Sequence, residues 1–252
     1  VKIGGNIIDN DNALLSFLND FTKLQQPKIL VHGGGKLATR MSEKLEIPTQ
    51  MIDGRRVTDV QTIRIVTMVY AGWINKSIVA RLQALGCSAI GLSGADANVI
   101  PAQRRSPVPV DYGFVGDVIP QNINVDFIQS LFQQNIVPVF CAITHDSKGD
   151  LLNSNADGIA SSLAVALSKD NEVRLTYCFE KKGVLSNTED DNSVISRITK
   201  ESYAALKQKG IITAGMIPKI DNAYKAIDAG VKEVVIKHAA DITNTQYGTI
   251  II

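Results

Sequence analysis

The chain has 252 residues, of which 45% are hydrophobic and 20% charged, a composition typical of a globular protein with a sizeable core. Lys and Arg number 26 against 25 Asp and Glu, which gives a net charge of +1. Without a dense basic run this balance argues against a nucleic-acid partner, although small anions need only a local positive site.

Strand-like and helix-like segments alternate along most of the chain, which predicts a largely parallel sheet covered by helices. In the first part we expect, in order, a strand at 1–5, a helix at 12–24 capped by Asp11, a strand at 28–31, a helix with Leu37, Met41 and Leu45 facing inward, a hairpin at 50–57, and a long helix from a Thr58 cap to about Leu85. The second part predicts a strand at 88–92, paired β segments at 99–120 forming a flap, a helix at 127–134, a strand at 136–141, a helix at 156–167 capped by Asn155, strands at 173–177 and 183–186, helices at 200–208 and 219–229, and a strand at 233–237.

The predicted long helix is apolar on more than one face. Ile63, Val66 and Tyr70 lie along one side, whereas Ile65 and Trp73 lie elsewhere. Such a helix needs cover beyond a single core, so dimerisation through it and plain burial both remain open.

Two glycine turns follow strand-like runs, at Gly4-Gly5 and at Gly33-Gly34-Gly35. Glycine lets the backbone approach a ligand closely, so that its N–H groups can point at anionic oxygens. A tight turn would also need glycine, but anion binding is the better interpretation.

Three charged residues give these turns a chemical meaning. Lys2 interrupts a short apolar strand, Lys219 follows a proline at a helix start, and Asp157 lies near another helix start. Each alone is unremarkable. Together, two ammonium groups and a carboxylate beside glycine turns are what transfer of a phosphoryl group requires, which predicts a kinase for a small acidic metabolite. Arg56, in the segment 54–58, is the candidate clamp for a substrate carboxylate.

Six ordered segments carry a resemblance over nearly the whole length. They are Lys2-Ile3-Gly4-Gly5, Val31-His32-Gly33-Gly34-Gly35, Gly54-Arg55-Arg56-Val57-Thr58, Gly113-Phe114-Val115-Gly116, Asn153-Ser154-Asn155-Ala156-Asp157 and Gly210 to Lys219. In these segments the chain resembles the amino acid kinase family, and within it the acetylglutamate kinases.

The resemblance implies a three-layer αβα sandwich with a mainly parallel open sheet. It implies an amino-terminal lobe at 1–170 for the acyl amino acid and for dimerisation, and a carboxy-terminal lobe at 171–252 for the nucleotide, on one continuous sheet. The expected reaction is ATP-dependent phosphorylation of the γ-carboxylate of N-acetyl-L-glutamate in arginine biosynthesis, by a cytoplasmic homodimer built on the helix at 59–85.

The resemblance implies the following roles. Lys2, Lys219 and Asp157 are catalytic: the two lysines stabilise the transition state, and Asp157 holds both of them in place. The backbone of Gly4, Gly5 and Gly34 binds the phosphoryl group; Gly34, Gly35, Arg56, Asn153 and Asn155 bind the substrate; and Thr176, Tyr177, Gly183, Ile211, Thr213 and Met216 bind the nucleotide. No protein metal site is expected, because Mg²⁺ would be held mainly by the phosphates of ATP.

The chain departs from the family pattern after Leu175-Thr176. The family usually has an aspartate there, whereas this chain continues Tyr177-Cys178-Phe179 and carries a loop three residues longer before Gly183. This segment helps to build the nucleotide pocket, so an inactive, amino-acid-binding regulator on the same fold is an alternative. A kinase for carbamate or aspartate is another, against which the segment 54–58 followed by the long helix argues.

The flap leaves the acyl group open. A cap with its own carboxylate, such as succinyl, would need an extra cationic donor, and Arg104 and Arg105 are candidates; acetyl is the first choice. Arginine inhibition in this family accompanies an additional amino-terminal helix. None is visible, so we expect an uninhibited enzyme if the native protein starts close to Val1.

Two further expectations concern location. No apolar run approaches the roughly 20 residues that a spanning helix needs, so we expect no membrane partner. Cys87, Cys141 and Cys178 lack metal-ligand spacing, which indicates free thiols in the cytoplasm.

Overall fold

The computed structural model describes residues 1–25, 27–52, 54–212 and 216–252. In this part of the chain, a continuous eight-stranded sheet runs in the order β12-β14-β13-β11-β1-β2-β8-β5. Its strands are β12 (Arg197–Ile198), β14 (Thr249–Ile251), β13 (Glu233–His238), β11 (Arg174–Phe179), β1 (Lys2–Ile3), β2 (Leu30–His32), β8 (Val137–Phe140) and β5 (Ala89–Leu92). Neighbours pair in parallel except β13 and β14, so the predicted mainly parallel sheet is confirmed.

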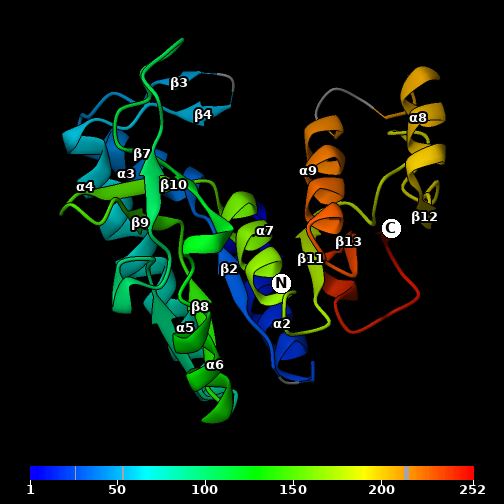
Figure 1. The fold of residues 1–252 in the computed structure, drawn as a ribbon, viewed down its shortest axis with the longest axis horizontal. Helices are drawn as coiled ribbons and strands as arrows, with labels where there is room; N and C mark the ends of the chain where they lie inside the picture. The colour runs from blue at the N-terminus through cyan, green and yellow to red at the C-terminus, as the bar shows by residue number, and fades with distance from the viewer. Residues whose placement is uncertain (26, 53, 213–215) are drawn as a thin grey trace.

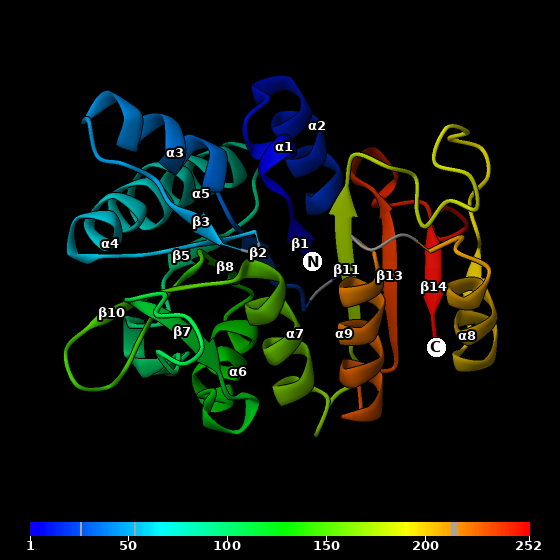
Figure 2. The same cartoon turned by 90° about the horizontal axis from the view of Figure 1, so that it is seen from above.

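Helices cover both faces of this sheet (Figures 1 and 2). Figure 2 shows α2 (Asp11–Thr22), α3 (Gly35–Lys44) and α5 (Asn75–Ala84) on one side, and α6 (Val125–Gln133), α7 (Ala156–Leu167) and α9 (Ile217–Asp228) on the other. A parallel sheet whose strands are apolar on both faces needs this double cover. The three-layer αβα sandwich is therefore confirmed.

The crossovers place strand ends and helix starts at one edge of the sheet. The short helix α1 (Gly5–Ile8) begins directly after β1, and α3 begins three residues after β2. In open sheets of this kind, ligands bind outside the carboxyl ends of the strands. Both glycine turns lie at that edge.

A second, four-stranded sheet carries the flap. Its order is β6 (Ala102–Arg104), β7 (Val115–Val118), β10 (Leu151–Ser154) and β9 (Ile143–His145). The antiparallel β6–β7 pair confirms the predicted flap, whereas β9 and β10 were not predicted. The hairpin at 50–57 is also confirmed, as β3 (Met51–Ile52) and β4 (Arg55–Arg56).

The long helix is continuous but not uniform. It comprises α4 (Val60–Thr67), a π-helical segment (Met68–Ile74) and α5, and its cap is Asp59, whose side chain accepts from the N–H of Thr62, not Thr58. Thr58 is instead fully buried and bridges Gly113 of the flap. An acidic side chain at the cap satisfies a free N–H and complements the helix dipole better than the neighbouring threonine.

Two helix details predicted from the sequence were wrong. Asn10, not Asp11, caps α2 through the N–H of Ala13. In α3 the buried residues are Ala38 and Ser42, while Met41 and Leu45 are exposed. Leu37, the third residue predicted to face inward, is partly buried and packs against the core, and α3 packs against α4.

The strand predicted at 183–186 is also wrong. Beside β13 the sheet edge is already occupied by the antiparallel β14, so 183–186 forms a loop with a single bridge between Leu185 and Val194. The helix α8 (Lys200–Gln208) matches its prediction, and short 3₁₀ helices lie at Asp96–Asn98, Pro120–Asn122 and Ala239–Asp241. Within the described residues, the helices are too short or too polar to cross a membrane.

Candidate active site

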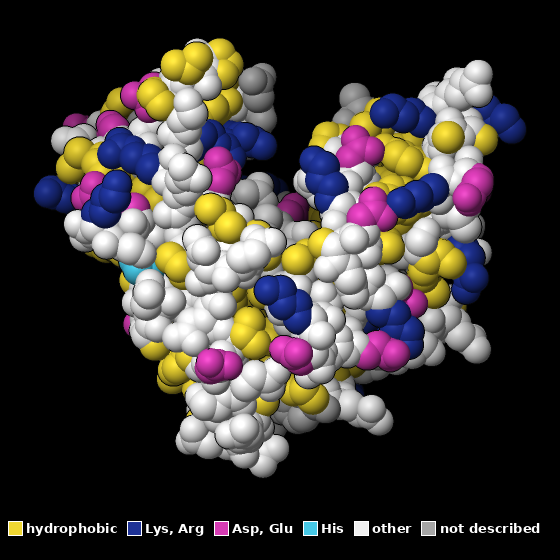
Figure 3. Space-filling view, viewed as in Figure 1, with side chains coloured by type: hydrophobic (Ala, Val, Ile, Leu, Met, Phe, Trp, Pro, Cys, Tyr) yellow, Lys and Arg dark blue, Asp and Glu magenta, His cyan; other side chains and the backbone are white. Residues whose placement is uncertain are grey.

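The molecule is hollowed between the part that carries β3 and β4 and the part that carries α8 and α9 (Figure 3). One pocket, of about 220 Å³, is lined by residues of the glycine turn, the hairpin and β10: Gly33, Gly34, Gly35, Met51, Gly54, Arg55, Arg56, Tyr70, Arg105, Val115, Ala142, Asn153, Ser154, Asn155 and Ala156. We call it the acyl pocket, and the next one the nucleotide pocket, after the ligands that the sequence leads us to expect there. The nucleotide pocket, of about 200 Å³, lies at the end of β11 and is lined by Phe179, Glu180, Lys181, Gly183, Val184, Leu185, Thr188, Ile211, Ile212, Met216, Lys219 and Ile236.

The acyl pocket gathers every residue expected to bind the substrate. Arg56 is only 7% exposed, and its guanidinium donates to the carbonyl of Gly35 at 2.9 Å and to the hydroxyls of Thr39 and Thr49 at 2.8 and 3.2 Å. These acceptors are all neutral. A buried cation whose hydrogen-bond acceptors among the described residues are neutral is suited to receive an anionic ligand.

Asn153 and Asn155 enter the same pocket from β10 and from the start of α7. The amide of Asn153 donates to the Thr58 hydroxyl at 3.1 Å, which orients its carbonyl oxygen. Asn155 caps α7 as predicted, accepting from the N–H groups of Asp157 and Gly158 at 2.8 and 3.1 Å.

Gly34 is required by packing. A Cβ there would lie 2.2 Å from Ile74 Cδ1 and 3.0 Å from the Tyr70 ring. The π-helical segment thus packs directly against the glycine turn. The turn leads into α3, whose first residue, Gly35, lines the pocket. N–H groups in the first turn of a helix are suited to bind an anion.

A buried histidine forms a hydrogen bond with this glycine turn. His32 is fully buried; its Nδ1–H donates to the carbonyl of Gly33 at 2.8 Å, so Nε2 accepts from the amide of Asn75 at 3.0 Å. Burial lowers the pKa of His32 to about 4. The neutral ring is therefore structural.

Lys2 and Asp157 meet between the two pockets. Lys2 Nζ lies 2.8 Å from Asp157 Oδ1, and Lys2 is only 8% exposed. Asp157 follows Asn155 of the acyl pocket by two residues, and Tyr177 donates to its carbonyl oxygen at 3.2 Å. This ion pair connects β1 with α7, as the sequence hypothesis required.

Lys219 lies on α9, and its closest partner among the described residues is an aromatic ring and not a carboxylate. Its Nζ lies 3.9 Å from the centre of the Phe179 ring, and Lys2 Nζ lies 5.4 Å from the same centre. Burial lowers the pKa of Lys219, with the charge of Asp157 opposing this effect and that of Lys2 adding to it. Asp157 was expected to hold both lysines. In the described structure it pairs with Lys2, and the aromatic ring is the close partner of Lys219.

The nucleotide pocket only partly matches the expected residues. Gly183, Ile211 and Met216 line it, whereas Thr176 and Tyr177 are buried within β11 and are not among its lining residues. Thr213 lies outside the described residues. Reasoning from sequence missed Phe179, Val184 and Leu185, because a strand end and a loop give no local signal of facing a pocket.

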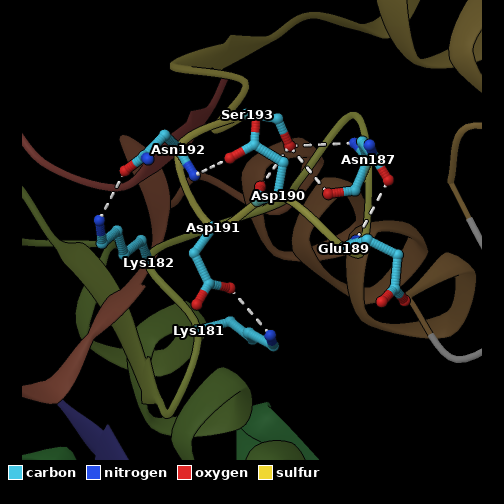
Figure 4. A network of polar contacts seen from close by, with 8 residues as sticks. All are labelled: Lys181, Lys182, Asn187, Glu189, Asp190, Asp191, Asn192 and Ser193. Atoms are coloured by element: carbon cyan, nitrogen blue, oxygen red, sulfur yellow. Dashed lines mark hydrogen bonds and ion pairs between the residues drawn. The ribbon is translucent and has the colours of Figure 1, made fainter.

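The extended loop between β11 and β12 borders this pocket and is bonded to itself (Figure 4). Lys181 pairs with Asp191 at 2.9 Å, and Lys182 donates to Asn192 at 2.9 Å. Ser193 donates to the carbonyls of Asn187 and Asp190 at 2.9 and 2.7 Å. The loop thus has a defined path although its segment around Asp190 is exposed to solvent.

Comparisons of the sequence with known proteins point in one direction. The amino acid kinase family matches residues 1–238. An acetylglutamate kinase of Parabacteroides distasonis is 51% identical over 96% of this chain and 94% of its own length. Those of Cytophaga hutchinsonii and Methanopyrus kandleri are 54% and 36% identical over 96% and 100% of this chain, and 91% and 98% of their own lengths.

Solved structures agree on the fold. The protein smu.665 of Streptococcus mutans superposes with a TM-score of 0.80 at 31% identity, covering 99% of this chain and 96% of that protein. Giardia carbamate kinase superposes with a TM-score of 0.69 at 13% identity, over 100% and 96% of the two chains, which shows the shared fold alone. With the profile match and the full-length relatives, these findings establish that the chain belongs to the amino acid kinase family.

Proposed function

We propose that the chain catalyses the ATP-dependent phosphorylation of the γ-carboxylate of N-acetyl-L-glutamate, in arginine biosynthesis. The names of the full-length relatives support this substrate. The acyl pocket supports it independently, since buried Arg56 is a clamp for an α-carboxylate and Asn153 offers an amide to the acyl-amino end.

In this proposal the γ-carboxylate needs no general base, because it is already ionised near neutral pH. Its oxygen attacks the γ-phosphorus of ATP, the bond to the bridging oxygen of ADP breaks, and an acyl phosphate and ADP leave. Lys2 and Lys219 stabilise the negative charge of the migrating group, and Asp157 fixes Lys2. Capping the α-amine prevents its attack on the activated γ-acyl group.

The nucleotide pocket fits a purine nucleotide. Half of its lining residues are Val, Leu, Ile or Met, of which Val184, Ile211 and Met216 are suited to a flat base, while Lys219 is suited to phosphate oxygens. Among the described residues no group of three or more His, Cys, Asp or Glu could hold a metal. In the proposed reaction Mg²⁺ would be held mainly by the phosphates of ATP and would neutralise part of their charge.

The observation that carries the proposal is the position of the Lys2–Asp157 pair between a cationic pocket and an apolar pocket. The test is ADP release with N-acetyl-L-glutamate, with aspartate and carbamate as competing acceptors. Acetylglutamate-dependent turnover is expected. Turnover only with aspartate or carbamate would refute the substrate, and binding without turnover would instead identify a non-catalytic regulator.

One observation favours a second substrate, N-succinyl-L-glutamate. Arg105 of the flap lines the acyl pocket; its Nε donates to Asp117 at 2.9 Å, but its Nη1 is buried without a hydrogen-bond partner in the described structure. An acyl group with its own carboxylate would supply that acceptor. The comparison is kcat/KM for the two acyl-glutamates in the wild type and in Arg105→Met. If succinylglutamate is the better substrate and loses more in the variant, the acetyl assignment falls.

We further propose a cytoplasmic homodimer built on the long helix. Met68 and Trp73 on its outer face are 58% and 69% exposed. Large apolar side chains grouped on one helix face are typical of an interface.

A further inference from the structure

Phe179 lies at the candidate active site, and the proposed reaction assigns it no role. It ends β11, lines the nucleotide pocket and is half-buried. Its ring contacts both lysines, with Lys219 Nζ at 3.9 Å and Lys2 Nζ at 5.4 Å from its centre. Since these two distances add to 9.3 Å, the two nitrogens lie no further apart than that.

The two lysines differ in how their charge is balanced. Lys2 has Asp157 at 2.8 Å. For Lys219, no carboxylate among the described residues lies within ion-pair distance, although it feels the charges of both Asp157 and Glu180. The face of an aromatic ring attracts an ammonium group through its quadrupole, and this attraction strengthens where water is partly excluded.

We propose that Phe179 is the positioning residue for Lys219, holding its ammonium group toward the nucleotide phosphates without neutralising it. An acidic side chain at this position would also hold Lys219, but as an ion pair that competes with the phosphoryl oxygens. The ring has no net charge, so the full positive charge remains for the transferring group. This inference rests on the proposed kinase function, because only there does Lys219 have a charge to stabilise.

The ring of Phe179 is itself packed against a second aromatic ring. Tyr177, two residues earlier on the same face of β11, stacks on Phe179 with centres 6.3 Å apart and planes 23° apart. The hydroxyl of Tyr177 donates to the Asp157 carbonyl. The aromatic pair therefore connects the partner of Lys2 with the support of Lys219, which are otherwise in different layers.

The test replaces the ring of Phe179 by an apolar side chain that has no aromatic face. Phe179→Leu should lower kcat by roughly three- to thirtyfold with less change in KM for the acyl-glutamate, and Phe179→Tyr should keep most of the activity. Mono-, di- and trifluorinated phenylalanine at 179 retain the shape but weaken the face stepwise, so log kcat should fall stepwise. Full activity in Phe179→Leu, or no trend with fluorination, would overturn the inference while leaving the kinase assignment intact.

A measurement that does not depend on turnover separates the inference about Phe179 from the proposed kinase function. The ring current of Phe179 should shift the NMR signal of the Lys219 ε-methylene upfield in the wild type, and Phe179→Leu should abolish that shift. The matched control is Lys207, whose Nζ lies 5.9 Å from the Tyr203 ring on α8 and whose signal should not change. An unshifted Lys219 signal in the wild type would refute the contact. An inactive wild type with the shift present would refute the proposed function instead.

Discussion

Lys2 and Lys219, from opposite ends of the chain, converge on the ring of Phe179. Lys2 is carried by β1 in the middle of the sheet, and Lys219 by the first turn of α9. Two like charges at this separation repel each other, and the negative face of the ring together with Asp157 offsets that repulsion. Convergence of the two ammonium groups is what the phosphoryl-transfer hypothesis required.

Removing either lysine should abolish most of the activity. Lys2→Ala and Lys219→Ala should each lower kcat by on the order of 10²- to 10³-fold, because each removes a charge that acts on the transferring group. ADP release at saturating substrates measures this, and Lys207→Ala on α8 is the control. If Lys219→Ala kept full activity, the mechanism would be wrong even though the fold is right.

Arg56 should act on substrate binding. Arg56→Gln should raise KM for the acyl-glutamate by on the order of 10- to 100-fold, since a charge-assisted bidentate contact is lost, while KM for ATP changes little. Arg64→Gln, on the exposed side of α4, is the matched control. An unchanged KM for the acyl-glutamate in Arg56→Gln would remove Arg56 from the binding site.

The fall of kcat at alkaline pH should result from deprotonation of Lys219. Its pKa is lowered by burial, so as pH rises the ammonium group is lost earlier than for an exposed lysine, and kcat should fall with it. Lys219→Arg, whose guanidinium stays charged, should be slower but should not show this fall. The measurement is the pH profile of kcat for the wild type and for Lys219→Arg. If kcat fell at the same alkaline pH in both proteins, the titrating group would not be Lys219.

His32 should make the fold sensitive to acid. Its folded pKa of about 4 lies below the ordinary value of 6.5, so the unfolded chain binds the proton more readily. Stability is therefore full above about pH 6.5 and is lost as pH falls toward 4, by at most about 3 kcal/mol. Urea unfolding at several pH values should show a smaller loss in His32→Gln, which lacks the titrating ring; an equal loss in both proteins would contradict this account.

Much of the architecture was predictable because local signals and tertiary structure agree. The alternation of segments predicted the parallel sheet, and Asn155 predicted the start of α7, where its side chain caps the helix. The candidate binding residues at the strand ends could be named from the sequence because glycine turns and an unexpected Lys2 stand out from an apolar strand.

The differences between prediction and structure have a common physical cause. Whether a side chain of a strand or helix is buried depends on which neighbouring element covers it. Tyr177 was expected to bind the nucleotide; its hydroxyl donates to the carbonyl of Asp157 at the start of α7, and it is not among the residues that line the nucleotide pocket. Phe179, two residues on, looks like one more core residue in the sequence, yet lies at the end of the strand and lines that pocket. Likewise Ala38 and Ser42 are the buried residues of α3, which packs against α4, and no periodicity in the segment reveals this.

Gly34 should tolerate no side chain, although its neighbour Gly33 should. In Gly34→Ala the new Cβ would lie 2.2 Å from Ile74 Cδ1, whereas in Gly33→Ala the nearest atom is Ala156 Cβ at an ordinary 3.8 Å. Overpacking of this kind costs about 1–3 kcal/mol, because the π-helical segment must move away from the turn. Urea unfolding of the two variants gives the comparison. Equal stability of the two variants would mean that Ile74 can rotate aside, and it would contradict the packing requirement at Gly34.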